Sequence, residues 1–564
     1  MELTTRSKSS LRYGLLVAVM ILIAAGAYFL AIPRPSPPSP TTTTLTTKPP
    51  PPRVLTIAMG TQPVNLDTAR CGGMINLGIM RLVSETPLDI HYATGELIPS
   101  LVERWEEVPD ATKWTLYLKK GVKFHDGTPF NATAIKVTFE RLIDPKTKAL
   151  TQGLWQMIKS IDVIDPHTAV INTEPNAAFL KKLNYAPCGI VSPTEIQKYG
   201  DNYGLGPHLP AGTGAYRYAE YVKGSHIKLV ANDQYWGGRP QIDIIYVKPV
   251  AEAAARMMAL EAGEVDFVFN APPPDIPRVK KNPDLYLLEG TPTRVMWITL
   301  NTQWGPLRNK MVRQALNYAV NKTAINERIF KGTAVIADCA LPRHAFGHTK
   351  VGPYPYDPAK AKQLLRDAGY PQGFEVTLRY GIGRYLMDAE LVEAIQSYLS
   401  AVGLKVRIEA LEWGTFQAKT NIPLEQNDCQ MTFLGAGVVQ LDFDQTMTDF
   451  TKAFWYPKGG HPSFYDNPRF DELHRLGGRT TDIDKRKAYY KEAHEIFWED
   501  APCIFLYFEP QLYAARRRAK EVYVRHDETI WLKQAWIEAK SGQSLLTVFW
   551  NLQPILVKTE DEAQ

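Results

Sequence analysis

Hydrophobic and polar positions along most of the chain follow two periods, one typical of strands and one typical of amphipathic helices. Residues 54–59 form a short apolar run, and residues 74–82 follow with the spacing of a helix. Residues 114–118 alternate apolar and polar side chains, and Lys120-Gly121 then turns the chain toward another short run, which predicts a hairpin. This mixture predicts an α/β protein.

The same alternation continues toward the C-terminus. Helices are predicted at residues 133–142, 359–368 and 389–401, and strands at 375–380 and 404–410, with two more strands joined by Asp165-Pro166 within 160–173. Helices laid over parallel strands are the packing that such an order favours.

The N-terminal region has a different pattern. Residues 14–32 are apolar and uncharged, long enough to cross a bilayer, and three cations precede them, which predicts a cytoplasmic end at 1–13 with the rest outside. The small residues 24–27 also fit a cleaved secretory signal. Residues 33–52 are nearly all Pro, Thr and Ser, which predicts an extended stalk without a core.

Composition narrows the class of protein. The chain has 564 residues, 45% of them hydrophobic and 22% charged, with a net charge of +5 spread along the sequence. It is long enough for more than one core, and nothing in it indicates nucleic-acid binding. The five cysteines are Cys71, Cys188, Cys339, Cys429 and Cys503. They lie far apart without metal-binding spacing, so we expect no metal site or cofactor. One or two disulfides are possible if the chain lies outside the cell.

Several motifs occur in a fixed order. They are WTLYLKKGVKFHDGTPFNATA at 114–134, GTGAY at 212–216, NDQYWGGRP at 232–240, ALEAGEVD at 259–266, VRQALNYAV at 312–320, DPAKAKQLLRDAGYP at 357–371 and IQSYLSAVG at 395–403. Taken alone, each motif is better explained by a structural role than by catalysis. His125 and Asp126, for example, are predicted to belong to a turn in which Asp126 bonds its own backbone and Gly127 accepts a positive φ. Together, over about residues 54–510, they resemble the oligopeptide-, dipeptide- and nickel-binding proteins of ABC importers, extracellular solute-binding family 5.

The resemblance implies a two-lobe periplasmic-binding-protein fold that encloses its solute at a hinge. On this sequence it places lobe one at 53–296 with an extra subdomain at about 85–205, lobe two at 297–504, and a return to lobe one with a C-terminal tail at 505–564. The chain would then cross the hinge near 299–302 and 501–506. Binding would favour the closed form that an ABC permease recognises, and we expect a membrane-tethered monomer.

The resemblance also indicates candidate binding residues. Trp413, in the segment EWGTF after a lobe-two strand, matches a position that lines the family's cavity. Trp297, Trp155 and Tyr385 lie near segments that approach the cleft. Such sites are mostly apolar and aromatic with a few orienting polar groups.

One departure from the family concerns the solute. Peptide binders carry an aspartate that pairs with the α-ammonium, and alignment on the glycine of Phe433-Leu-Gly435 puts Val439 there. Because a buried ammonium needs a counter-charge, a free peptide is disfavoured unless Asp442 or Asp444 reaches in. The aromatic content of 11% would suit an oligosaccharide, so both solute classes stay open.

Two other function classes, a hydrolase and a sensor, would require further sequence features. A secreted hydrolase would need a motif such as GxSxG or HExxH, and the sequence contains neither, which argues against an enzyme. A sensor ectodomain would bind the same solutes, although residues 1–11 are too short for a signalling domain of their own. Neighbouring permease or kinase genes would distinguish import from sensing.

Overall fold

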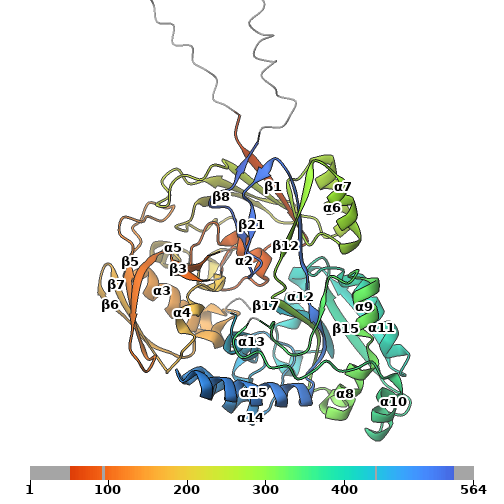
Figure 1. Cartoon of the computed structure of the whole chain (residues 1–564). Helices are drawn as coiled ribbons and strands as arrows, with labels where there is room; N and C mark the ends of the chain where they lie inside the picture. Colours follow the sequence, from red (N-terminus) through yellow and green to blue (C-terminus); the bar gives the residue numbers. More distant parts are fainter. Residues whose placement is uncertain (1–50, 92–95, 344, 438–440, 539–564) are drawn as a thin grey trace, which may run out of the picture. The chain divides into compact units, whose positions relative to one another are not determined.

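The computed structural model describes residues 51–91, 96–343, 345–437 and 441–538 (Figure 1), and the elements in them belong to one unit, Pro52–Gln564. The predicted anchor at 14–32, nearly all of the stalk, Val439 and residues beyond 538 lie outside the described residues. Within the described part of the chain, no helix is both long and apolar enough to cross a membrane.

A seven-stranded mixed sheet carries the first lobe. Its order is β12 (Leu285–Gly290), β19 (Gln511–Arg516), β11 (Phe267–Phe269), β1 (Val54–Met59), β10 (Ile244–Pro249), β9 (His226–Ala231) and β8 (Tyr216–Val222). Helix α2 (Met74–Met80) shares a core with β1, while α6 (Ala253–Ala262) contacts β11 and α7 (Ile276–Lys281) contacts β12. The predicted strand at 54–59 is confirmed, and the predicted helix at 74–82 ends two residues early.

A six-stranded sheet carries the second lobe. Its order is β14 (Val335–Ile336), β18 (Cys503–Phe508), β13 (Arg294–Leu300), β17 (Met431–Gly437), β15 (Glu375–Gly381) and β16 (Lys405–Leu411). Strands β13 and β18 are buried along their whole length, as expected of central strands covered on both faces. The α/β class and the predicted strands at 375–380 and 404–410 are confirmed.

Helices surround this second sheet. They are α8 (Lys310–Ala319), α9 (Lys322–Arg328), α10 (Pro358–Asp367), α11 (Asp388–Ser400), α12 (Trp413–Thr420), α13 (Phe443–Thr448), α14 (Pro468–Arg479) and α15 (Ile483–Asp500). Figure 1 shows α11 alongside β15, where Leu391 and Ile395 pack in one core with Leu378. It also shows α14 and α15 lying side by side.

The sheets locate the two hinge crossings. Strand β12 belongs to the first sheet and β13 to the second, so the chain crosses between residues 290 and 294; it returns between β18 and β19, between residues 508 and 511. The expected crossings near 299–302 and 501–506 are therefore corrected by several residues. The reason is that β13 and β18 pair with each other and belong wholly to the second lobe.

A four-stranded antiparallel sheet lies within residues 85–205, the range expected for the extra subdomain. Its order is β4 (Val102–Glu107), β5 (Lys113–Leu118), β7 (Thr168–Thr173) and β6 (Ile158–Asp165), with α3 (Ala132–Ile143), α4 (Phe179–Lys182) and α5 (Pro193–Tyr199) around it. The Asn131 side chain caps α3 by accepting from the Thr133 N–H. Three small ribbons complete the described elements: β2 (Leu88–Ile90) with β3 (Leu97–Pro99), β20 (Ala519–Lys520) with β23 (Trp536–Ile537), and β21 (Tyr523–Val524) with β22 (Ile530–Trp531).

Two expectations about reactive groups are settled by local geometry. The Thr128 N–H donates to the Asp126 carboxylate at 2.8 Å and Gly127 has a φ of +86°, which confirms that this motif builds a turn. All five cysteines fall in the described part of the chain, and each is a separate buried thiol in this structure.

Candidate solute-binding cavity

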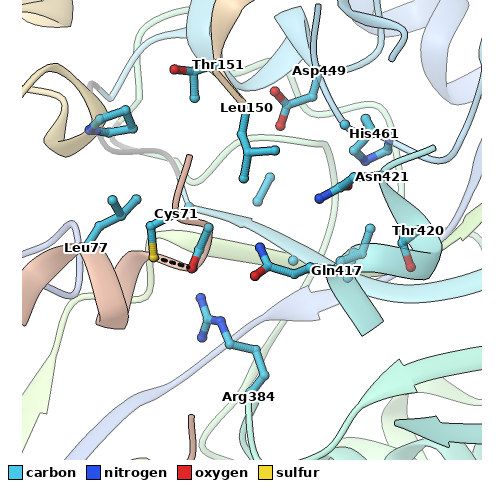
Figure 2. Close-up of a pocket in the computed structure, with 18 of the residues that line it drawn as sticks. Cys71, Leu77, Leu150, Thr151, Arg384, Gln417, Thr420, Asn421, Asp449 and His461 are labelled. Atoms are coloured by element: carbon cyan, nitrogen blue, oxygen red, sulfur yellow. Dashed lines mark hydrogen bonds between the residues drawn. The ribbon is translucent and has the colours of Figure 1, made fainter. Parts of the chain in front are cut away.

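A cavity of about 220 Å³ lies where both lobes and the extra subdomain contribute residues (Figure 2). The first lobe supplies the segment around Cys71 and Leu77, and the extra subdomain supplies Leu150 and Thr151. The second lobe supplies most of the rest, from β13, α12, β17, α13 and the loop that contains His461. A cavity built by several bodies is what a hinged binding protein requires, because closure completes the enclosure.

Three of the predicted aromatic residues line this cavity. Trp413, Trp297 and Tyr385 are all buried, with exposed fractions of 5%, 0% and 4%. Trp413 stands at the start of α12, where its ring stacks on Phe416 at 5.2 Å and meets Tyr385 edge-on at 6.5 Å. These rings already cover one another, so they form a rigid apolar wall.

The fourth predicted aromatic residue lies elsewhere. Trp155 is fully buried in the core of the extra subdomain, edge-on to Phe139 at 5.2 Å, and its Nε1 donates to the Thr151 hydroxyl. It is not among the residues that line the cavity, although its partner Thr151 is.

The two predicted acidic residues are each paired with a cation beside the cavity and do not line it. Asp442 accepts two hydrogen bonds from the Arg486 guanidinium, at 2.8 and 3.0 Å. Asp444 pairs with the Lys182 ammonium at 2.7 Å; although burial opposes it, this ammonium lowers the pKa of Asp444 to about 2. Both carboxylates therefore hold α13 in place and are not available to a solute.

A different carboxylate faces the cavity. Asp449 follows α13, and Figure 2 shows its side chain turned toward the open space. Within the described residues it forms no ion pair and no side-chain hydrogen bond, and burial raises its pKa to about 7. Such a carboxylate gains from a cationic partner, because it has lost water without gaining a protein counter-charge.

Two arginines, Arg294 and Arg384, also line the cavity. Arg294, at the start of β13, binds both carboxylate oxygens of Glu528, and it lies 3.5 Å from Glu509. Although burial opposes it, the Glu528 carboxylate raises the pKa of Arg294. Burial raises the pKa of Glu509 to about 7. Arg294 is therefore satisfied by protein groups.

Arg384 is not satisfied in this way. It follows Gly383, whose φ of +74° turns the chain at the end of β15, and its closest carboxylate oxygen, from Glu528, is 3.8 Å away. Its Nε and Nη1 are buried without a hydrogen-bond partner among the described residues. Burial, and next the charge of Arg294, lower the pKa of Arg384. Figure 2 shows this guanidinium entering the cavity from the side opposite Asp449.

Further polar atoms around the cavity also lack a hydrogen-bond partner within the described chain. They are Trp297 Nε1, Trp413 Nε1, Thr420 Oγ1, Thr446 Oγ1 and His461 Nε2. Burial lowers the pKa of His461 to about 3, so its ring is neutral, and its Nδ1 bonds Ser463. Unpaired buried donors and acceptors are costly, and a polar solute would satisfy them.

Sequence reasoning missed Arg384 and Asp449. The signal for Arg384 was present in the segment YGIGR, where a strand ends in glycines and a cation follows. Asp449 belongs to the same acidic stretch as Asp442 and Asp444, and a sequence does not show which of the three faces a cavity.

The fold and the cavity define a two-lobe protein with a cavity between its lobes that can enclose a solute. The family model for bacterial extracellular solute-binding proteins, family 5, matches residues 96–458. The chain belongs to this family. It is the extracytoplasmic solute-binding component of an ABC importer and not an enzyme.

Curated relatives and solved structures agree with this assignment. The chain is 32% identical over 436 residues to the glutathione-binding protein GsiB of Pectobacterium atrosepticum, covering 77% of this chain and 84% of that one. It resembles the periplasmic binding protein DppA of Helicobacter pylori in complex with the peptide STSA, with a TM-score of 0.80 and 26% identity over 86% of this chain and 98% of that one. The oligopeptide-binding protein AppA of Bacillus subtilis, at 21% identity and a TM-score of 0.79 over 87% of this chain and all of that one, shares the fold.

Trp413 offers a test of the cavity wall. Trp413→Phe keeps a ring against Phe416 and removes the unpartnered Nε1, so we expect solute affinity to fall by about 1 kcal/mol, roughly fivefold. Trp114→Phe is the matched control, because that buried indole lies in the subdomain core and donates to Thr173, which does not line the cavity, and its affinity should stay unchanged. Calorimetry on both variants checks this; equal affinities in the wild type and Trp413→Phe would remove Trp413 from the site.

Proposed function

We propose that the cavity binds a short peptide, or a peptide-like amino-acid derivative, by its two charged ends. One observation carries this proposal: two charges of opposite sign, Asp449 and Arg384, enter one cavity from opposite sides, and neither is hydrogen-bonded to a counter-charge in the described chain. The α-ammonium would pair with Asp449 and the carboxylate with Arg384. The two relatives named above bind glutathione and the peptide STSA, and both of these solutes are peptides.

The backbone of β17 supports the same proposal. Its pairing with β15 ends at Thr432 opposite Arg379, while its pairing with β13 continues to Gly437. Residues 434–437 line the cavity. Gly435 on this edge already bonds the Tyr385 hydroxyl and the Arg294 guanidinium, so an extended peptide would meet the backbone of β17 beyond it, at Gly437.

This proposal replaces the expectation that a peptide is disfavoured for want of an aspartate. That expectation considered Val439, which lies outside the described residues, and Asp442 and Asp444, whose charges are already paired. An oligosaccharide is less well supported, because it would leave Asp449 without a counter-charge and Arg384 with only the 3.8 Å contact to Glu528, and one face of Trp413 is already covered by Phe416.

A melting-temperature screen of the purified protein tests the solute class. Glutathione and the tetrapeptide STSA should raise the melting temperature, since a solute that binds the native state stabilises it by RT ln(1 + [L]/Kd). Neutral oligosaccharides at the same concentrations should leave it unchanged. Stabilisation by an oligosaccharide and by none of the peptides would contradict the proposal.

We also propose that the protein works as a monomer tethered to the membrane. The support is the uncharged apolar run at 14–32 and the Pro/Thr-rich segment at 33–52, which would have little purpose on a freely diffusing protein. The native protein should keep residues 1–32 and stay with the membrane fraction in high salt. N-terminal sequencing checks this, and a mature N-terminus within residues 27–34 would show that the run is a cleaved signal.

A further inference from the structure

A second group of chemically reactive side chains lies outside the solute cavity. Asp338, Cys339 and His348 bring a carboxylate oxygen, a sulfur and a ring nitrogen within 4.8 Å of one another. They lie in the loop between β14 and α10, and none of them lines the cavity. We propose that these three side chains bind a divalent cation of the zinc class. The proposal goes beyond solute binding and does not depend on it.

The loop folds back on itself to assemble the group. The backbone N–H groups of Val351 and Gly352 donate to the Asp338 carbonyl at 3.0 and 2.7 Å, which returns the chain to Asp338 just after His348. Ala337 donates to the Leu506 carbonyl of β18, so the other end of the loop is attached to the central sheet. Backbone hydrogen bonds of the second lobe therefore hold Asp338, Cys339 and His348 close together.

Two of the three candidate ligand atoms have no other role. Asp338 is 4% exposed, and its Oδ1 is buried without a hydrogen-bond partner within the described residues. The same holds for His348 Nε2, which faces that oxygen at 3.6 Å, beyond hydrogen-bond distance. Leaving both atoms desolvated and unpaired is costly. A cation between them would satisfy both at once.

The third ligand and the surroundings fit a metal centre. Cys339 is fully buried, and its sulfur accepts a hydrogen bond from the Leu341 N–H at 3.2 Å, an interaction that also stabilises a thiolate. Arg343 contacts the other oxygen of Asp338, Oδ2, at 3.5 Å. Hydrogen bonds of this kind to the ligands orient them and are usual around protein metals.

The donor set indicates which cation fits. One sulfur, one imidazole nitrogen and one carboxylate oxygen suit Zn²⁺ and similar borderline ions, whereas Ca²⁺ and Mg²⁺ take oxygen ligands. On binding, the Cys339 S–H, which here donates to the Leu341 carbonyl at 3.0 Å, would release its proton to solvent. The thiolate and the carboxylate would then balance the charge of the ion, and water would take the fourth position.

Cobalt titration of the full chain, stripped of metal by a chelator, tests the proposal. Co²⁺ adopts zinc geometry and absorbs in the near ultraviolet when a thiolate binds it. We expect one equivalent to give this absorption, and Zn²⁺ to displace it. Cys339→Ala should abolish the absorption. His348→Gln should weaken Co²⁺ binding by about tenfold to a hundredfold.

Matched controls keep the result interpretable. Cys188→Ala removes another buried thiol, in the extra subdomain, and should leave the absorption unchanged. His348→Gln alters a partly exposed side chain, so circular dichroism should show a folded protein even if Cys339→Ala does not fold. Absence of thiolate absorption in the wild type, or absorption that persists at the same affinity in folded His348→Gln, would overturn the proposal.

Discussion

Peptide affinity should fall by roughly thirtyfold to several thousandfold in Asp449→Asn, because removing one partner of a buried charge pair costs about 2 to 5 kcal/mol. The asparagine keeps the size of the side chain and removes the charge that pairs with the α-ammonium. Calorimetry with a free peptide and its N-acetylated form gives a double-mutant cycle. Acetylation should weaken binding to the wild type strongly and to Asp449→Asn little, and an equal loss in both proteins would show that the ammonium binds elsewhere.

The same carboxylate predicts a pH dependence. Burial raises the pKa of Asp449 to about 7 in the solute-free protein, and an ammonium partner would lower it. Affinity should therefore be full above pH 7 and fall as the pH drops below 7, by up to about tenfold per pH unit. Burial also raises the pKa of Glu509, so the part of the pH dependence that Asp449→Asn removes is the part that belongs to Asp449.

That variant should also be more stable without solute. A carboxyl group whose folded pKa lies above its unfolded pKa holds its proton more tightly when folded, so it stabilises the folded state at low pH and loses this contribution as the pH rises through 7. At pH 8 the free energy of unfolding of solute-free Asp449→Asn should exceed that of the wild type. A residue that lowers the stability of the solute-free protein is expected where that residue serves solute binding.

Arg384→Gln is the second change with a large expected effect. It removes the unsatisfied guanidinium that would meet the solute's carboxylate, so affinity for a free peptide should again fall by about 2 to 5 kcal/mol. Binding of the C-terminally amidated peptide, already weak in the wild type, should change little. Calorimetry with the two peptides measures this, and equal losses for both would assign Arg384 a purely structural role.

The neighbouring arginine provides the contrast. Arg294 binds Glu528 through both oxygens and lies near Glu509, so Arg294→Gln would leave buried carboxylates unpaired. It should lower the free energy of unfolding by about 3 to 5 kcal/mol, whereas Arg384→Gln should keep the stability close to that of the wild type. Urea denaturation distinguishes the two. A large loss of stability in Arg384→Gln would mean that its 3.8 Å contact with Glu528 matters more than this account allows.

The elements of the fold could be predicted well wherever one face of an element is buried. Strand β5 alternates buried and partly exposed residues, and α3 buries the face that carries Ala134 and Leu142, so both have clear periods in the sequence. The hinge crossings could not be located in this way. Strands β13 and β18 are apolar throughout, and a continuous apolar run does not show which sheet it joins.

The candidate site was only partly predictable. The aromatic wall followed from family resemblance, and three of its four predicted members line the cavity. The charged residues of the cavity could not be predicted from the sequence, because their availability depends on partners distant in sequence. Lys182 and Arg486 form ion pairs with Asp444 and Asp442, while no cation in the described chain pairs with Asp449. Whether a charge is free for a solute is a property of the tertiary structure.

Calorimetric titration of the wild-type protein with one peptide in three forms shows whether the cavity binds both charged ends of a peptide. The peptide with both ends free should bind, and both the N-acetylated and the C-amidated forms should bind at least about thirtyfold more weakly, since each loses one buried charge pair. Glutathione and the peptide STSA are the peptides to try first. Binding that is equally tight for all three forms, or that appears with oligosaccharides and with no peptide, would contradict the account.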